Sequence, residues 1–147
     1  MNSLVGQWKE VYREEASKNN VEAMVTYALL LLQPTADAPG NPSDAVRWLQ
    51  KCSTSSPEAA HTLGVMYSKG KYIPADLDKS YFYFKLSTLF RCRCGKYRNE
   101  YHSNLISNVH PCYPFLSKEA LKKLKLSPER RRLCEKKFNA WQARNLR

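Results

Sequence analysis

The chain has 147 residues, of which 43% are hydrophobic and 25% are charged. This length most simply means one domain, and the composition is typical of a globular protein rather than a disordered one. The longest apolar run, residues 27–32, is too short to cross a bilayer, so we expect no membrane insertion. The first residues have no basic head followed by an apolar stretch, so we predict no secretory signal.

The net charge of +11 is unevenly distributed along the chain. Residues 1–90 carry nine basic and nine acidic residues, whereas residues 91–147 carry fifteen basic and four acidic ones. This asymmetry indicates an anionic partner for the C-terminal third, such as an acidic protein, a nucleic acid or an anionic membrane. The alternative is a solvated face that only aids solubility.

The five cysteines are irregularly spaced, and their odd number argues against a secreted disulfide framework. We therefore expect reduced thiols and a cytoplasmic location. Thiols and imidazoles that could bind zinc do gather within 21 residues, although their spacing fits no familiar zinc finger: Cys92, Cys94, His102, His110 and Cys112. Zinc at this cluster stays open as an alternative, and we expect no metal and no cofactor.

Apolar residues recur at helical spacing along the chain, and strand-like alternation is almost absent. We predict helices over 4–16, 21–33, 42–53, 57–69, 77–90, 97–109 and 128–143, and a short helix that begins at Ser117. Residues that can cap a helix precede four of these segments: Asn41, Ser56, Asp76 and Ser127. Pro111 and Pro114 are expected to break the helix before Ser117. The elements together predict an all-α domain built from antiparallel helix pairs.

Two stretches of the chain, 45–53 and 80–88, align at a shift of 35 residues. Each begins with a small residue, followed on the next turn by a large aromatic and a large apolar residue. Small residues let neighbouring helices approach closely, and aromatic residues fill the space between helix pairs. The pattern therefore indicates a helical repeat.

The second unit carries a more detailed signature, Ala60-x-x-Leu63-Gly64-x-x-Tyr67-x-x-Gly70 followed by Ile73-x-x-Asp76-x-x-Lys79-Ser80-x-x-Tyr83-Phe84. It resembles the Sel-one-like repeat, a relative of the tetratricopeptide repeat. The clear match covers about 30 residues, and a weaker one extends over about 20–90. This chain departs from the family pattern at Tyr72 (glycine in the family), Ile73 (valine), Ser80 (alanine) and the pair Tyr83-Phe84 (tryptophan and tyrosine).

The resemblance implies structural roles for the matched residues: Gly64 for close helix contact, Gly70 for ending a helix, Asp76 for capping the next one, and Tyr67 and Tyr83 for packing. It implies a short right-handed α-solenoid of about three antiparallel helix pairs with terminal capping helices. We expect a single domain over 1–147, with a repeat-like core at about 20–90 and a basic C-terminal cap at 91–147. A solenoid of this class presents a concave face that binds other chains.

Catalysis is not indicated by any motif. The chain has three histidines and no nucleophile elbow, phosphate-binding loop, dinucleotide fingerprint or zinc-protease helix. A Cys112 dyad with His102 or His110 stays open as a nucleophilic arrangement, although no motif supports it. Phe138 and Trp141 follow Cys134 at helical spacing, which predicts a core stripe rather than a surface for stacking bases.

We therefore expect a non-enzymatic protein–protein interaction module, such as an adaptor, a regulator or a toxin-neutralising protein, that binds an acidic protein. The alternative is a nucleic-acid-binding protein that uses the basic C-terminal third, and self-association through an exposed terminal helix pair is a further expectation. The predicted partner-binding residues are Tyr27, His61 and Met66 on the concave face, and Arg91, Arg93, Lys96, Arg98, Arg130, Arg131 and Lys137 in the basic third.

Overall fold

The computed structural model describes residues 4–34, 39–91 and 112–146. Within these residues the chain is all helical and has no strand. The expected helix over 97–109 lies outside the described residues. The helices are α1 Leu4–Ser17, α2 Val21–Leu31, α3 Pro42–Cys52, α4 Pro57–Lys69, α5 Leu77–Thr88, α7 Tyr113–Lys123 and α8 Pro128–Asn145.

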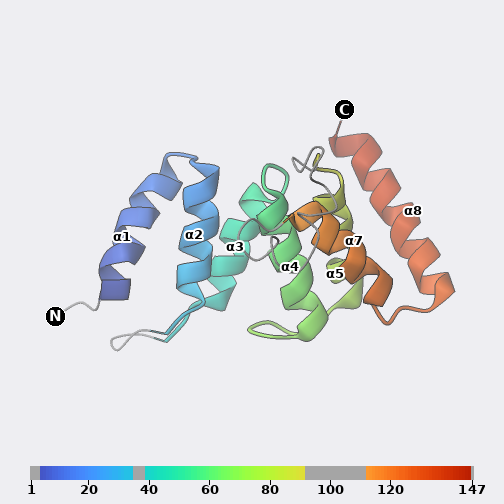
Figure 1. The fold of residues 1–147 in the computed structure, drawn as a ribbon, viewed down its shortest axis with the longest axis horizontal. Coiled ribbons are helices and arrows are strands. Elements are labelled where there is room, and N and C mark those ends of the chain that lie inside the picture. Colours follow the sequence, from blue (N-terminus) through green and yellow to red (C-terminus); the bar gives the residue numbers. More distant parts are fainter. Residues whose placement is uncertain (1–3, 35–38, 92–111, 147) are drawn as a thin grey trace.

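Consecutive helices pack against one another from α1 to α5, and α7 and α8 then pack against α5 at the other end of the array. The two ends of the chain lie at opposite ends of this elongated array (Figure 1). Helix α7 contacts both α4 and α5, and α8 contacts α5. The predicted all-α, solenoid-like architecture is confirmed.

The four predicted helix caps are present. Each side chain accepts a hydrogen bond from the backbone N–H three residues further on, at 3.2 Å for Asn41, 3.1 Å for Ser56 and Asp76, and 3.2 Å for Ser127. These bonds satisfy donors that the first turn of a helix leaves unpaired. Because capping is a local interaction, the starts of α3, α4, α5 and α8 could be predicted to the residue.

Helix α7 differs from the prediction. It begins at Tyr113 rather than Ser117, and Pro114 lies in its first turn. A proline at that place starts a helix instead of breaking it, because the missing N–H would have no partner there. Ser117 is fully buried inside the helix and does not cap it.

The repeat-like unit packs through the residues that the signature singled out. A Cβ atom on Gly64 would lie 2.5 Å from Cδ1 of Phe84, so only glycine lets α4 and α5 approach this closely. Gly70 ends α4 in the left-handed conformation, with φ of 65°. The rings of Tyr67 and Tyr83 stack with their centroids 5.9 Å apart. These structural roles are confirmed.

Two departures from the family pattern have a visible consequence. The hydroxyl of Ser80 is buried and donates a hydrogen bond to the carbonyl oxygen of Gly64 at 2.7 Å, so the polar group is satisfied. Tyr72 stands where the family pattern has a glycine and adopts φ of 73°, a conformation that favours glycine. The backbone therefore adopts a glycine-type turn with a tyrosine at this position.

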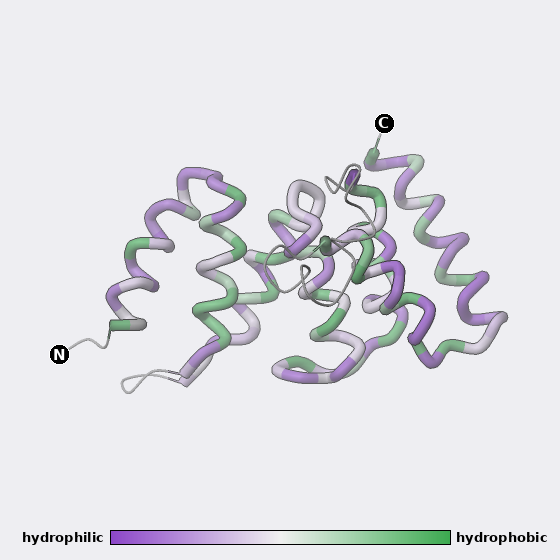
Figure 2. Tube along the Cα trace, viewed as in Figure 1, coloured by the Kyte–Doolittle hydropathy of each residue, from purple (hydrophilic) through white to green (hydrophobic). Residues whose placement is uncertain are grey.

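The core is divided along the array. A large apolar cluster joins α1, α2, α3 and α4, and it includes Ala16, Ala28, Leu49 and Leu63. Two smaller clusters join α5 to the C-terminal helices, one around Phe84 and Leu124 and one around Leu86 and Phe138. Figure 2 shows the same change in hydropathy, with α2 largely apolar and α8 largely hydrophilic.

Candidate functional site

The three predicted residues of the concave face have different environments. Met66 has 4% of its surface exposed and belongs to the large apolar cluster, so it cannot contact a partner without repacking. Tyr27 is half-buried and packs edge-on against Trp48, with the ring centroids 5.5 Å apart. Of Met66 and Tyr27, only Tyr27 has an accessible side chain.

His61 lies at the contact between α4 and α7. Its Nδ1 is 2.8 Å from the hydroxyl oxygen of Ser117, and its ring packs against the rings of Phe84 and Tyr113 at centroid distances of 5.4 and 5.5 Å. Burial lowers the pKa of His61 to about 4, so the imidazole is neutral near pH 7. This histidine joins two helices and does not face outward as the concave-face prediction requires.

Tyr113 and Glu58 complete the same contact between the helices. The Tyr113 hydroxyl donates to Oε1 of Glu58 at 3.1 Å. Burial, with the neighbouring carboxylate as a second cause, raises the pKa of Tyr113 to about 12. A serine–histidine pair can activate a nucleophile, but a nucleophile must reach its substrate and Ser117 is fully buried. The arrangement is therefore suited to holding α7 on α4.

Arg130 is committed to an ion pair with α5. Its Nε donates to Oδ1 of Asp78 at 2.9 Å, and its Nη2 donates to Oδ2. The hydrogen bonds from Arg130 hold the pKa of Asp78 below its usual range. The Cys134 thiol lies 3.5 Å from the same carboxylate. Arg130 thus connects α8 to the first turn of α5.

Arg131 is also used within the fold. Its guanidinium donates to the carbonyl oxygens of Leu121 and Leu124, at 2.8 and 2.5 Å. These carbonyls lie at the C-terminal end of α7, where helix carbonyls lack partners in the helix itself. Arg131 therefore secures the turn between α7 and α8, and two of the predicted partner-binding arginines have structural contacts.

Glu135 and Asp78 are contact residues that the sequence analysis missed. Glu135 accepts hydrogen bonds from the Tyr81 hydroxyl at 3.1 Å and from Nζ of Lys85 at 3.3 Å. The hydrogen bond from Lys85 is the main reason that the pKa of Glu135 lies below its usual range. The sequence carries a signal for Glu135 alone, because it is one of only three acidic residues in the basic segment 112–146.

The remaining basic residues of α7, α8 and the link between them are exposed, and we call these eight residues the exposed basic surface. They are Lys118, Lys122, Lys123, Lys125, Arg132, Lys136, Lys137 and Arg144. Residues 112–146 contain ten basic and three acidic residues, so this end of the molecule has a local net charge of +7. Lys122 pairs with Glu119 at 3.0 Å on the helix surface.

The aromatic residues of α8 point away from this surface. Phe138 is 1% exposed and packs edge-on against Phe82, at 5.5 Å between centroids. Trp141 packs against Phe82 at 4.9 Å. The predicted core stripe is confirmed, and the ring of Phe138 is not available for stacking on bases.

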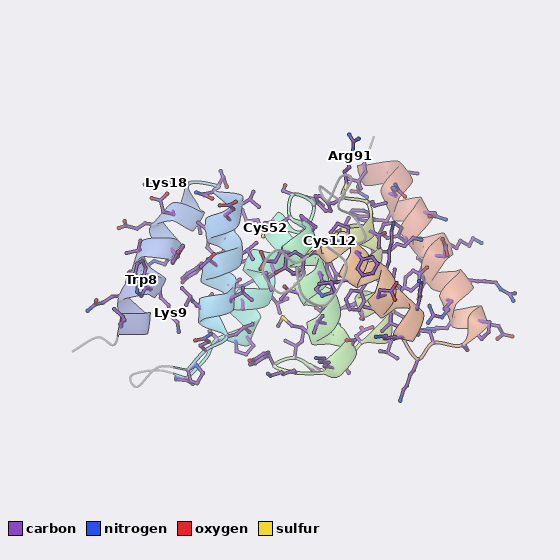
Figure 3. The ribbon with its side chains drawn as sticks, in the orientation of Figure 1. Trp8, Lys9, Lys18, Cys52, Arg91 and Cys112 are labelled. Atoms are coloured by element: carbon purple, nitrogen blue, oxygen red, sulfur yellow. The ribbon has the colours of Figure 1, made fainter. Side chains whose placement is uncertain are left out.

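The second predicted basic cluster is only partly described. Arg91 follows α5 and is exposed at the edge of the molecule (Figure 3). Arg93, Lys96 and Arg98 lie outside the described residues, as do Cys92, Cys94, His102 and His110. Cys112 is buried just before α7. In the described part of the chain, no three histidine, cysteine, aspartate or glutamate side chains are grouped so that they could hold a metal ion.

None of the helices in the described ranges is both long and apolar enough to cross a membrane. Comparisons with protein-family models, with curated proteins and with solved structures found no match to this chain.

Proposed function

We propose that this protein is a non-enzymatic interaction module that binds an acidic protein through the exposed basic surface of α7 and α8. The observation that carries the proposal is that only some of the basic residues of α8 make contacts within the fold, whereas the others are exposed. Arg130 and Arg131 are held by Asp78 and by helix carbonyls, whereas eight other basic side chains extend into solvent. A surface with this local excess of positive charge steers and binds partners of opposite charge.

An acidic protein fits this surface better than a nucleic acid. Six of the eight exposed basic residues are lysines, which act as point charges and lack the planar fork that reads base edges. Of the aromatic residues of α8, Phe138 is buried and Trp141 is half-buried against Phe82. A nucleic acid would thus be held mainly by its phosphates, and nucleic-acid binding is the outcome against which the proposal is tested.

The resemblance to Sel-one-like repeats supports the same proposal. The matched residues of that unit pack helices and carry no chemistry, as expected of a binding scaffold. Cys52 and Cys134 are buried free thiols, which agrees with a reducing compartment. The proposal therefore includes membership of this repeat class and a cytoplasmic location.

The test is affinity capture from the native cell extract at moderate salt, with and without nuclease. The bait variant R132Q/K136Q/K137Q removes three exposed charges from α8. The matched control R47Q/K51Q/K69Q removes three exposed charges from α3 and α4, so both variants have the same net charge.

We expect one stoichiometric acidic protein that survives nuclease, is lost with the α8 variant and is retained with the control. Equal loss with both variants would show that only net charge matters and would overturn the proposed surface. Loss of every partner after nuclease would replace the acidic protein with a nucleic acid. In that case, the logarithm of the affinity falls linearly with the logarithm of the salt concentration.

A further inference from the structure

The loop between α4 and α5 holds an exposed tyrosine in a strained backbone conformation. Tyr72 is 47% exposed and has φ of 73°, a region that bulky residues rarely adopt. The other non-glycine residue with positive φ in the described ranges is Asn19, and asparagine tolerates this conformation. Residues held in such strain gather at functional sites. Tyr72 is therefore a candidate for a role outside the fold.

The loop fixes the position of the Tyr72 ring. Ile73, the next residue, packs against the large apolar cluster. The backbone N–H of Asp76 donates to the carbonyl oxygen of Tyr67 at 3.0 Å, which ties the end of the loop to α4. Nζ of Lys71 lies 5.1 Å from the centre of the Tyr72 ring, in a cation–π contact. The ring is thus preorganised, and little of it has to be ordered when a partner covers it.

Core packing does not explain the ring of Tyr72. Among the described residues, Tyr72 belongs to none of the three apolar clusters. Trp8, the other exposed aromatic residue of the described ranges, lies on a regular helix and packs on Tyr12, with the ring centroids 6.1 Å apart. Tyr72 thus combines exposure, backbone strain and a fixed position. Tyrosine is one of the residues that most often contribute a large share of the binding energy at protein interfaces.

The Tyr72 loop lies at the same end of the helices as the link between α7 and α8 (Figure 1). The loop leads into Asp78 in the first turn of α5, and the link leads into Arg130 in the first turn of α8. These two side chains form an ion pair, which holds the loop and the link together. The link carries Lys125 of the exposed basic surface. A partner that covers this end of α8 can therefore also reach the Tyr72 loop.

The charge of the loop fits the same partner. Lys71 is exposed, and in the ranges that the structure describes no ion pair involves it. The carboxylate of Asp76 is already used, because it accepts the backbone N–H of Lys79 as the cap of α5. The loop therefore presents a positive charge beside an aromatic ring. This combination suits a carboxylate of the partner with an apolar group next to it.

We propose that Tyr72 is an anchor residue for the acidic partner of the exposed basic surface, and that the interface extends from α7 and α8 onto the α4–α5 loop. This inference rests on the proposed function. The exposed basic surface supplies charge, and Tyr72 supplies the aromatic contact area that interface cores contain and that lysines lack. The strained backbone lowers the stability of the fold and places the ring where the partner contacts it.

The experiment titrates variants of the full chain as baits in native cell extract after nuclease treatment. Y72G and Y72N remove the ring and suit the left-handed backbone, so both should fold. Y72F removes only the hydroxyl group. The matched control W8A removes the other exposed aromatic ring, which has an exposed fraction of 49% and lies at the opposite end of the array. Thermal unfolding checks that every variant is folded.

We expect Y72G and Y72N to need at least about tenfold more bait than the wild type for half-maximal capture of the acidic protein. Y72F and W8A should match the wild type. Wild-type capture by Y72G and Y72N would overturn this inference and leave the proposed function standing. An equal loss with W8A would also overturn it, because the effect would not be specific to the loop. A wild type that captures no acidic protein would overturn the proposed function, and this inference with it.

Discussion

The N-terminal and C-terminal halves of the molecule are held together by different interactions. From α1 to α4 the helices share one continuous apolar cluster, built on small residues such as Ala28 and Ala45. Helices α7 and α8 join α5 through smaller apolar clusters, with ion pairs between α8 and α5. Arg131 of α8 also donates to backbone carbonyls at the end of α7. The neutral half is thus stabilised mainly by close packing, and the basic half uses part of its charge for structure.

This difference teaches that a basic segment cannot be read as a binding surface from its composition alone. Three arginines are adjacent in the sequence but have different environments. Arg130 pairs with Asp78, and Arg131 donates to two carbonyl oxygens at the C-terminal end of α7. Arg132 is exposed. Helix geometry sends adjacent residues to different sides. The capacity of such a segment to bind a partner depends on which of its charged side chains make no ion pair or hydrogen bond within the fold.

The largest effect is expected where packing is closest. G64A places a Cβ atom 2.5 Å from the Phe84 ring and should lower the free energy of unfolding by about 3 kcal/mol. Chemical denaturation measures this loss. The double variant G64A/F84L relieves the clash, so it should lose less than the sum of the two single variants. Additive losses would contradict the close contact between α4 and α5.

The next prediction concerns pH and the contact between α4 and α7. Folded His61 has a pKa of about 4, whereas an exposed histidine has a value of 6.5, so the unfolded state binds more protons between these values. The free energy of unfolding should therefore fall as the pH falls from 6.5 to 4, by about 3 kcal/mol from this residue. Comparing the wild type with H61Q at each pH isolates the effect. Parallel pH profiles for the two proteins would contradict the burial of His61.

A smaller effect separates structural from exposed charges on α8. R130Q should lower the free energy of unfolding modestly at pH 7, because it removes an ion pair with Asp78 that is partly exposed to solvent. K137Q, two helical turns further along the same side, should cost less. The difference should vanish at low pH, because a carboxylate with a lowered pKa stabilises the fold only while it is ionised. Equal costs at pH 7 would contradict the structural role of Arg130.

The last substitution is expected to stabilise the fold rather than destabilise it. Y72G should raise the free energy of unfolding by about 0.5 kcal/mol, because glycine adopts the positive φ of this position without strain. G70A, at the other left-handed residue of the same loop, should instead lower it by about 1 kcal/mol. Thermal unfolding of the two variants checks both signs. A destabilised Y72G would show that the exposed ring makes a contact that outweighs the backbone strain.

The features that were predictable from the sequence are those set by local interactions. Four helix starts followed from capping residues, and the roles of Gly64 and Gly70 followed from the repeat signature. The start of α7 was missed because Pro114 has two opposite effects, depending on its place relative to the first turn. The inward contacts of His61, Arg130 and Met66 could not be predicted, because they depend on which helix packs on which.

The central claim is that exposed charges of α7 and α8 bind the partner while Arg130 and Arg131 hold the fold. The most direct measurement compares the capture of the acidic partner by R132Q/K136Q/K137Q with its capture by R47Q/K51Q/K69Q, after nuclease treatment. We expect that the first variant remains folded and loses the partner, and that the second retains it. Retention of the partner by both variants, with the fold intact, would contradict the account.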